Sequence, residues 1–404
     1  MIRQKIVASA IGALFGAGLL AGCGAASTSS ATGSTVTIVS LRATSGPTAS
    51  LGIPGNNALK MEVNALNAKG GLLGKKIKLD FINTQGNPNQ ATSDARQAVL
   101  SDHAVALFGG VSSGDMAYTE EVAAKYKTIL FSYTANDVVF TSTKAFTPYF
   151  FSIVPNTRME PMAVAQVFKK EGWTRIYTIS PNYSFGHAEV SGFLSALTKL
   201  GVHYKLLGQQ WPALGAPNFT SNISAILSAH PQAVFGGIYG TDLATFTKEA
   251  SGYNFFKKTH FVAQYGAIDL QALGKSAPVG AVGYARGAWW TLHSPSISSF
   301  VHKYHAKYGN YPSSFSLLGA EAFQSWVYAV KKAGTFNPSK LIKVLPGATV
   351  PTLAGNVTIR ACDHQAEIPE YVGVIKPSHK YPFDTYNPVF STPWSSIKYA
   401  CPTP

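Results

Sequence analysis

The chain has 404 residues, of which 46% are hydrophobic and 13% charged, and 33 lysine and arginine residues outnumber 19 aspartate and glutamate residues, for a formal net charge of +14. This length exceeds the size at which one hydrophobic core stops growing, so two domains are expected. The lysines are dispersed rather than clustered, which argues against nucleic acid as a partner. The positive excess suits either an acidic exterior, which we favour, or attraction of an anionic solute into a positive cleft.

The first residues have the pattern of an export signal. Two cations precede an apolar run at 6–20, which is short for a membrane-spanning helix and is followed by Ala-Gly-Cys23. This ending resembles the bacterial lipobox, in which the cysteine thiol receives a lipid. We therefore expect a lipoprotein signal peptide at 1–22, a lipid anchor on Cys23 and a flexible tether at 23–35, the alternative being an uncleaved anchor helix. The protein would then be held at the outer face of the cell membrane or in the periplasm.

Cysteine usage fits an oxidising compartment. Of three cysteines, lipidation of Cys23 leaves Cys362 and Cys401 as an even pair. A disulfide between these two would fasten the C-terminal tail. Two free buried thiols are the alternative.

Predicted strands and helices alternate along the chain from Val36. The strands are β-branched or apolar runs, and the helices repeat apolar residues every three or four positions. Because each helix stands between strands, we expect an α/β fold with parallel sheets covered on both faces. Strands are expected at 36–41, 77–81, 104–108, 128–132, 175–180, 202–207, 233–238 and 260–263, and helices at 56–69, 87–100, 114–127, 159–171, 185–200, 219–230, 241–252, 297–308 and 320–333.

The alternation restarts after Pro155, which indicates two similar lobes. From Pro295 onward two helices follow each other with few strand signals, which is too little for a third lobe. This region should therefore complete one of the first two, and the chain must cross between the lobes more than once. Several crossovers form a hinge, and a cleft beside it can close on a ligand.

Six segments, in this order, resemble one family. They are Leu41–Gly52 (LRATSGPTASLG), Glu62–Lys75 (EVNALNAKGGLLGK), Phe108–Ser113 (FGGVSS), Asn182–Gly186 (NYSFG), Phe235–Tyr239 (FGGIY) and Asp363–Gln365 (DHQ). The set is similar to the type I periplasmic binding proteins, and within them to the leucine/isoleucine/valine-binding receptors. The resemblance covers nearly the whole mature chain.

The resemblance implies two Rossmann-like lobes with parallel central sheets, joined by a three-stranded hinge with crossovers near Pro155, Gly287 and Leu353. It also implies binding of a small-molecule solute without chemistry, cofactor or metal, and delivery to the membrane permease of an ABC importer; we expect a monomer. The expected units are an N-terminal lobe of 36–154 plus 288–353, a C-terminal lobe of 155–287 plus 354–390, and a tail of 391–404.

The ligand should lie where loops follow the C-terminal ends of strands, because backbone amides there hold anions. On one wall we expect hydroxyls and amides to bind a carboxylate, and on the other we expect aromatic rings. Ordinary helix-capping or packing roles are the alternative for each. The candidates, several of which match family positions, are Ser112, Ser113, Thr134 and Asn136 on the first wall and Tyr183, Phe185, Tyr239 and Tyr265 on the second.

One departure from the family bears on the ligand. Amino-acid receptors of this family place a carboxylate after the strand that corresponds to 260–263, where it pairs with the ligand ammonium, and here Tyr265 aligns with it. A buried ammonium without a counter-charge costs several kcal/mol. We therefore expect a carboxylate or amide solute of aromatic or branched-chain type, unless Asp269 reaches in, in which case a branched-chain amino-acid receptor proper is the alternative. Tyr284, Trp289 and Trp290 are expected to pack at the second crossover.

Enzyme signals are weak. Gly110–Gly114 fits the G-x-S-x-G pattern of serine α/β-hydrolases, with Ser112 as the nucleophile. That enzyme also needs an acid and a histidine on separate loops, whereas Asp363 and His364 are adjacent. His302 and His305 stand three apart on a helix, but no third metal ligand has suitable spacing.

Overall fold

The computed structural model describes residues 34–402, which form one compact unit. The predicted signal peptide, the lipidation candidate Cys23 and nearly all of the tether lie outside the described residues. Over the described part, no helix has the length and apolarity needed to cross a membrane.

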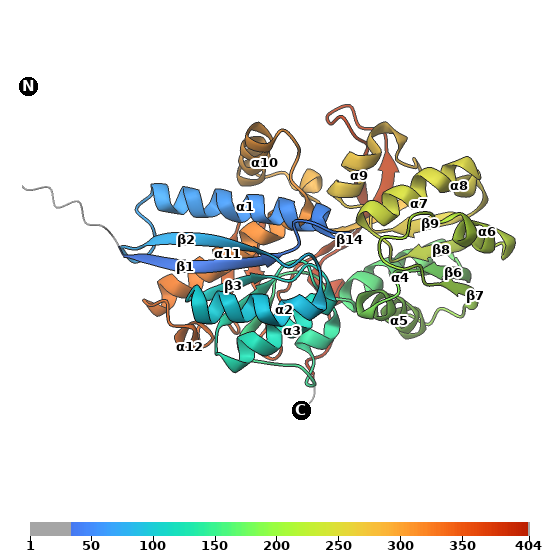
Figure 1. The fold of residues 1–404 in the computed structure, drawn as a ribbon. Helices are drawn as coiled ribbons and strands as arrows, with labels where there is room; N and C mark the ends of the chain where they lie inside the picture. Colours follow the sequence, from blue (N-terminus) through green and yellow to red (C-terminus); the bar gives the residue numbers. More distant parts are fainter. Residues whose placement is uncertain (1–33, 403–404) are drawn as a thin grey trace, which may run out of the picture. The chain divides into compact units, whose positions relative to one another are not determined.

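The first sheet has five strands in the order β2-β1-β3-β4-β5, all parallel. Strands β3, β4 and β5 are buried throughout because helices cover both faces of the sheet, as Figure 1 shows. Ile38, Phe108 and Phe131 pack toward α1 and α11, whereas Val39 and Leu107 pack toward α2 and α3. The strands are β1 (Thr35–Arg42), β2 (Lys76–Asn83), β3 (Ala106–Gly109), β4 (Ile129–Ser132) and β5 (Phe150–Ser152), and the helices are α1 (Ala49–Ala68), α2 (Pro88–Arg96), α3 (Ser113–Lys125) and α11 (Ser314–Ala333). We call this unit the N-lobe.

The second sheet has seven strands in the order β14-β13-β10-β9-β8-β6-β7. Helices α6, α7 and α9 cover one face, and α4 and α5 cover the other. The strands are β6 (Arg175–Ile179), β7 (Lys205–Gln210), β8 (Ala233–Gly236), β9 (His260–Ala263), β10 (Val282–Arg286), β13 (Glu370–Lys376) and β14 (Thr385–Thr392), and the helices are α4 (Met159–Glu171), α5 (Ser184–Lys199), α6 (Thr220–Ser228), α7 (Gly240–Gly252), α8 (Phe255–Lys258) and α9 (Ala267–Leu273). We call this unit the C-lobe.

Three segments join the two sheets. They are residues 153–158 after β5, residues 287–294 after β10 and residues 359–369 before β13, which we call the first, second and third crossovers. Between the second and third crossovers, the chain adds helices α10, α11 and α12 and a β11–β12 hairpin to the N-lobe. Phe300 and Tyr304 of α10 pack against Ala58 of α1, and β11 packs on α11. The bounds are α10 (Pro295–Tyr308), α12 (Pro338–Leu341), β11 (Thr349–Thr352) and β12 (Gly355–Thr358), with α13 (Trp394–Ile397) after β14.

The predicted α/β fold with two lobes and parallel sheets is confirmed, with differences in detail. Strands β13 and β14 run antiparallel to their neighbours, and the strands that were not expected are β5, β10, β11, β12, β13 and β14. Helix α1 begins at Ala49, before the helix expected at 56–69, and it contains Pro54. The boundary expected at Leu353 falls in the turn of the β11–β12 hairpin, so the chain reaches the second sheet later, through 359–369. The tail begins after Thr392, where β14 ends.

Candidate ligand-binding site

Two neighbouring cavities lie where loops of the N-lobe face loops of the C-lobe. They share the lining residues Leu51, Tyr239, Gln264, Arg286 and Phe315. The shared residues come from α1 and α11 of the N-lobe and from the ends of β8, β9 and β10 of the C-lobe. Ligands of open α/β sheets bind at such strand ends. We call the pair the interlobe cavity.

The N-lobe wall contains three of the four polar residues predicted there. Ser113, Thr134 and Asn136 line the smaller cavity and are buried. Arg42 positions Thr134, because its guanidinium donates to the Thr134 hydroxyl over 2.8 Å and to the Leu51 carbonyl over 2.8 Å. Ser113 Oγ and Asn136 Oδ1 have no hydrogen-bond partner among the described residues. Such groups cost free energy when buried unless a ligand or water completes them.

Ser112, the fourth predicted residue of that wall, does not line either cavity. It is the N-cap of α3: its hydroxyl accepts a hydrogen bond from the Asp115 amide over 3.1 Å and donates to Asp115 Oδ1 over 2.9 Å. The structure therefore gives Ser112 the capping role that the sequence analysis held as its alternative.

The predicted aromatic residues Tyr183, Phe185 and Tyr239 meet at the C-lobe wall. All three line the smaller cavity, and Tyr239 lines both. The hydroxyls of Tyr183 and Tyr239 are hydrogen-bonded over 2.6 Å, and the Phe185 ring packs edge-on against Tyr239 at 5.5 Å. These contacts present a fixed aromatic surface to the cavity.

Tyr265 does not belong with these rings, contrary to the prediction. It is fully buried in the C-lobe core, where its ring packs on Phe261 and its hydroxyl is hydrogen-bonded to Thr247 over 2.8 Å. After β9 the side chains alternate, so Gln264 and Gly266 line the cavity while Tyr265 points to the opposite side. Because side chains alternate in extended backbone, a prediction that is wrong by one position names a residue whose side chain points away from the cavity.

Asp269 does reach the cavity, four residues later. It occupies the first turn of α9, and its Oδ2 accepts a hydrogen bond from the Gly266 amide over 3.0 Å. Its Oδ1 has no partner among the described residues, and neither do Gln264 Nε2 and Ser314 Oγ in the same cavity. Burial raises the pKa of Asp269 to about 8. A ligand group that donates hydrogen bonds to this carboxyl, above all a cation, would reverse that rise.

Sequence reasoning missed Arg286, which lines both cavities at the end of β10. Its Nη2 donates to Glu160 Oε2 over 2.9 Å, its Nε pairs with Glu160 Oε1, and its Nη1 donates to the Thr134 carbonyl over 2.8 Å. Glu160 also accepts from Asn136 Nδ2 over 2.8 Å. This buried ion pair of the C-lobe thus holds the N-lobe loop that contains Thr134 and Asn136. An isolated arginine at a strand end carries no signal that would have identified it beforehand.

Two more buried glutamates lie beside this ion pair. Glu189 of α5 and Glu370, which faces Arg286 across the β10–β13 pairing, are at most 1% exposed, and none of their carboxyl oxygens has a hydrogen-bond partner among the described residues. Burial, and then repulsion by Glu160, raise the pKa of both well above the ordinary value of 4.5. Three carboxyl groups and one guanidinium therefore share this site, which favours the protonated form of Glu189 and Glu370.

Because the folded protein favours the protonated form of Glu189 and Glu370, we expect the protein to be less stable at higher pH. Above about pH 4.5 Glu189 and Glu370 ionise in the unfolded chain but keep their protons in the folded one, so the free energy of unfolding falls as pH rises, by about 1.4 kcal/mol per pH unit per group. Urea unfolding between pH 5 and 8 measures the slope. The E189Q/E370Q variant, which mimics the protonated groups, should have a shallower slope; an unchanged slope contradicts the assignment.

The residues of the rival hydrolase are not brought together. The Ser112 hydroxyl is engaged with Asp115, while His364 stacks on Phe151 at 4.4 Å and contacts the Phe150 carbonyl through Nδ1 over 3.0 Å. Burial lowers the pKa of His364 to about 4. Within residues 34–402, no group of three or more potential metal ligands was found.

Known proteins resemble the chain over most of its length. The family model described as "Periplasmic binding protein" matches residues 35–380. The Leu/Ile/Val-binding protein homolog 4 of Brucella abortus is 27% identical over 344 residues, which cover 81% of each chain. Among solved structures, an ABC transporter solute-binding protein of R. palustris in complex with benzoate superposes with a TM-score of 0.78 at 20% identity, covering 89% of this chain and 97% of that one. A leucine-, isoleucine-, valine-, threonine- and alanine-binding protein of Brucella ovis gives a TM-score of 0.77 at 22% identity, covering 91% and 97%. The chain therefore belongs to the periplasmic binding protein family, and its two lobes have the fold expected from the resemblance to the type I members.

Proposed function

We propose that this protein is the solute receptor of an ABC importer and captures an amino acid with an apolar side chain in the interlobe cavity. The observation that carries the proposal is the set of buried polar atoms without partners around that cavity, contributed by both lobes. Ser113 and Asn136 line the smaller cavity, Asp269 and Ser314 line the larger one, and Gln264 lines both; each has a side-chain atom without a partner among the described residues. An amino acid, whose ammonium and carboxylate groups lie close together, would place one charged group near each of these two sets of polar atoms.

Asp269 is the reason to favour an amino acid over a simple carboxylate. In the sequence, position 265 is tyrosine where amino-acid receptors of the family have a carboxylate, which argued against an ammonium ligand. Asp269 was the one residue expected to supply the counter-charge if it reached the cavity. Its unpartnered oxygen lines the cavity beside the rings of Tyr239 and Phe315, which can also attract a cation. The carboxylate of the solute would bind at the other end, through Ser113 and neighbouring groups.

The cavity walls favour an apolar side chain on the solute. Leu51, Tyr239 and Phe315 line both cavities. Phe185 and Val111 add apolar surface to the smaller cavity, and Ile268 adds it to the larger one. Burial of such a side chain contributes about 1.5–3 kcal/mol. The second candidate is a benzoate-type aromatic acid, which the same aromatic walls and Arg286 support and which a related solved structure binds.

The proposal includes how the protein is held and what it serves. We propose export under the signal at 1–22, lipid anchoring through Cys23, action as a monomer and delivery of the solute to the permease of the importer. Binding without turnover is proposed because the family consists of binding proteins and because Ser112 is engaged as a helix cap.

A thermal-shift screen tests the proposed function. Branched-chain and aromatic amino acids, their α-hydroxy-acid analogues and benzoates are added separately, because a solute that binds only the folded state raises the melting temperature. We expect the amino acids to raise it more than the matched hydroxy acids. A larger rise with benzoates would favour the second candidate, and hydrolysis of a p-nitrophenyl ester would support the hydrolase instead.

Alanine variants of Ser112 and Ser113 are expected to differ in effect: one should lower stability and the other should weaken binding. Ser112→Ala removes the N-cap of α3 and is expected to lower the free energy of unfolding by about 0.5–2 kcal/mol with little change in affinity. Ser113→Ala removes an unpartnered cavity hydroxyl and is expected to weaken binding of the best solute from the screen by about 0.5–1.5 kcal/mol. Urea unfolding and calorimetric titration of both variants decide this; the reverse pattern would restore Ser112 to the site.

A further inference from the structure

The C-terminal tail, residues 393–401, is fixed to the C-lobe by its first half. Helix α13 packs on α4, with Ile397 only 1% exposed among the apolar residues of that helix. Gln166 of α4 also donates to the Ser396 carbonyl over 2.9 Å. This half of the tail therefore moves with the C-lobe.

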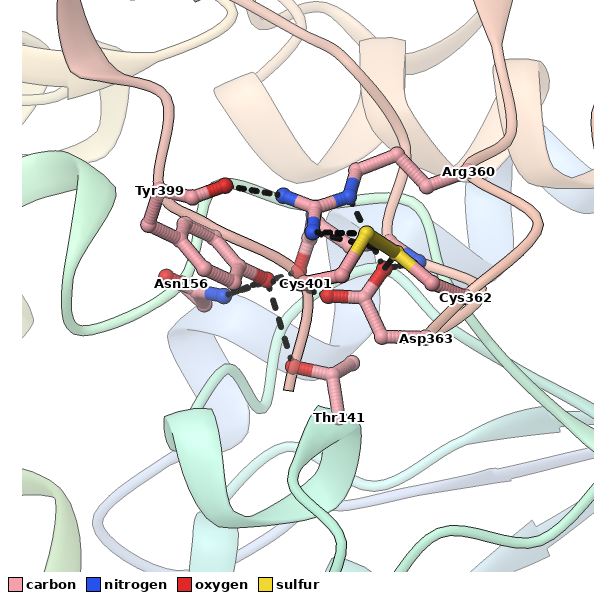
Figure 2. The surroundings of a disulfide bond; sticks show 8 residues. Thr141, Asn156, Arg360, Cys362, Asp363, Tyr399 and Cys401 are labelled. Carbon is pink, nitrogen blue, oxygen red and sulfur yellow. Dashed lines mark hydrogen bonds and ion pairs between the residues drawn. A yellow bond between two sulfur atoms is a disulfide. The ribbon is translucent and has the colours of Figure 1, made fainter. Parts of the chain in front are cut away.

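The second half of the tail is fixed to the crossovers. Figure 2 shows the disulfide that joins Cys401 to Cys362 of the third crossover, with 5.9 Å between the Cα atoms. Beside it, Arg360 donates to the Tyr399 carbonyl over 3.0 Å and stacks over the Tyr399 ring at 4.3 Å. One covalent bond and one cationic side chain thus hold the tail to the third crossover.

The Tyr399 hydroxyl connects the tail to both outer crossovers (Figure 2). It donates to Asp363 Oδ2 of the third crossover over 2.9 Å and accepts from Asn156 Nδ2 of the first over 2.8 Å. It also lies 3.5 Å from the Thr141 hydroxyl, on the N-lobe side of the hinge. The two crossovers also contact each other, because Gln365 Nε2 donates to the Val154 carbonyl over 2.7 Å. The tail therefore touches both lobes and both of these crossovers.

We propose that residues 393–401 form a strap across the hinge that limits how far the two lobes open. The proposal rests on the proposed function, in which the lobes open and close around a solute. Hinge motion changes backbone dihedrals in the crossovers, so the distance between α4 and residues 360–365 must change as the lobes separate. The strap resists that change because a disulfide tolerates little change in the separation of its cysteines.

The strap has a consequence for solute retention. A receptor whose ligand-free lobes stay nearly closed has a larger fraction of molecules ready to bind, and the apparent dissociation constant varies inversely with this fraction. Reduction of Cys362–Cys401 would release the end of the tail and leave the noncovalent contacts that Tyr399 and Trp394 make with the crossovers. Solute release would then become faster.

The test compares the C362S/C401S double variant and Y399F with the unchanged protein. The ligand-free radius of gyration, from small-angle X-ray scattering, should be larger in both, most in the double variant, and solute dissociation in stopped flow should be about threefold faster or more. Y149F is the matched control, because Tyr149 loses only a hydrogen bond to Ser339 within the N-lobe. The radius with saturating solute should be the same in all four proteins.

The proposal fails if both variants keep the unchanged ligand-free radius and dissociation rate, even where their melting temperatures fall. That outcome would mean that the disulfide and Tyr399 only stabilise the tail and do not limit how far the lobes open. Y399F keeps the disulfide and most of the packing, so it answers the question even if the double variant does not fold. Because the radius is measured without solute, failure of the strap is distinguishable from failure of the proposed function, which the thermal-shift screen decides.

Discussion

Replacing Arg286 by methionine is expected to lower the free energy of unfolding by about 3–5 kcal/mol, because Glu160 would stay buried without its partner. The two side chains are 5% and 0% exposed, so water cannot take over the lost contacts. Nearby Glu189 and Glu370 offer no positive charge in its place. Urea unfolding at pH 7 measures the loss.

Two further variants control this result. The R286M/E160M variant removes both charges and should recover much of the lost stability, because a buried ion pair can often be replaced by apolar side chains at little cost. The exposed Arg96 of α2 offers the matched control, and R96M should change stability by no more than about 0.5 kcal/mol. Equal effects of R286M and R96M would show that the Arg286–Glu160 pair contributes little.

Replacing Asp269 by asparagine is expected to have the largest effect on affinity. A hydrogen bond to a charged group contributes about 1.5–3 kcal/mol, so binding of an amino acid should weaken about 10- to 150-fold. Asparagine has nearly the same shape and can still accept from the Gly266 amide, so folding should be kept. Calorimetric titration gives the affinity of both proteins.

The pH dependence of binding provides the second readout for Asp269. Burial raises the pKa of this carboxyl to about 8 in the free protein, so an ammonium ligand must displace its proton at neutral pH. Affinity for an amino acid should therefore rise between pH 6 and 8, and D269N should lose this dependence. If affinity is independent of pH in the unchanged protein, Asp269 does not face an ammonium.

Much of the fold could be predicted because burial on both faces imposes a simple pattern. The segments 104–108 and 129–131 are continuously apolar since helices cover both sides of their sheet, and strands β3 and β4 overlap them. Strands β13 and β14 escaped the prediction because the regular alternation with helices ends before them. Strand β5 has only three residues, and its apolar sequence has no period that separates it from a loop.

The site was predicted less completely, for reasons that concern single positions. Loops after β4, β6 and β8 were expected to carry cavity residues, and Thr134, Tyr183 and Tyr239 lie there. Ser112 and Ser113 have the same chemistry, and only the geometry of the helix start decides which one caps α3. Arg286 and Glu160 are 126 positions apart, so no local pattern could pair them.

A crystal structure of the protein with the most stabilising amino acid from the screen tests the central claim most directly. We predict the solute between the lobes, with its amino nitrogen about 3 Å from Asp269 Oδ1 and its carboxylate at Ser113 and its neighbours. Density for the solute outside the space bounded by Leu51, Tyr239 and Arg286, or an amino group turned away from Asp269, would contradict the account.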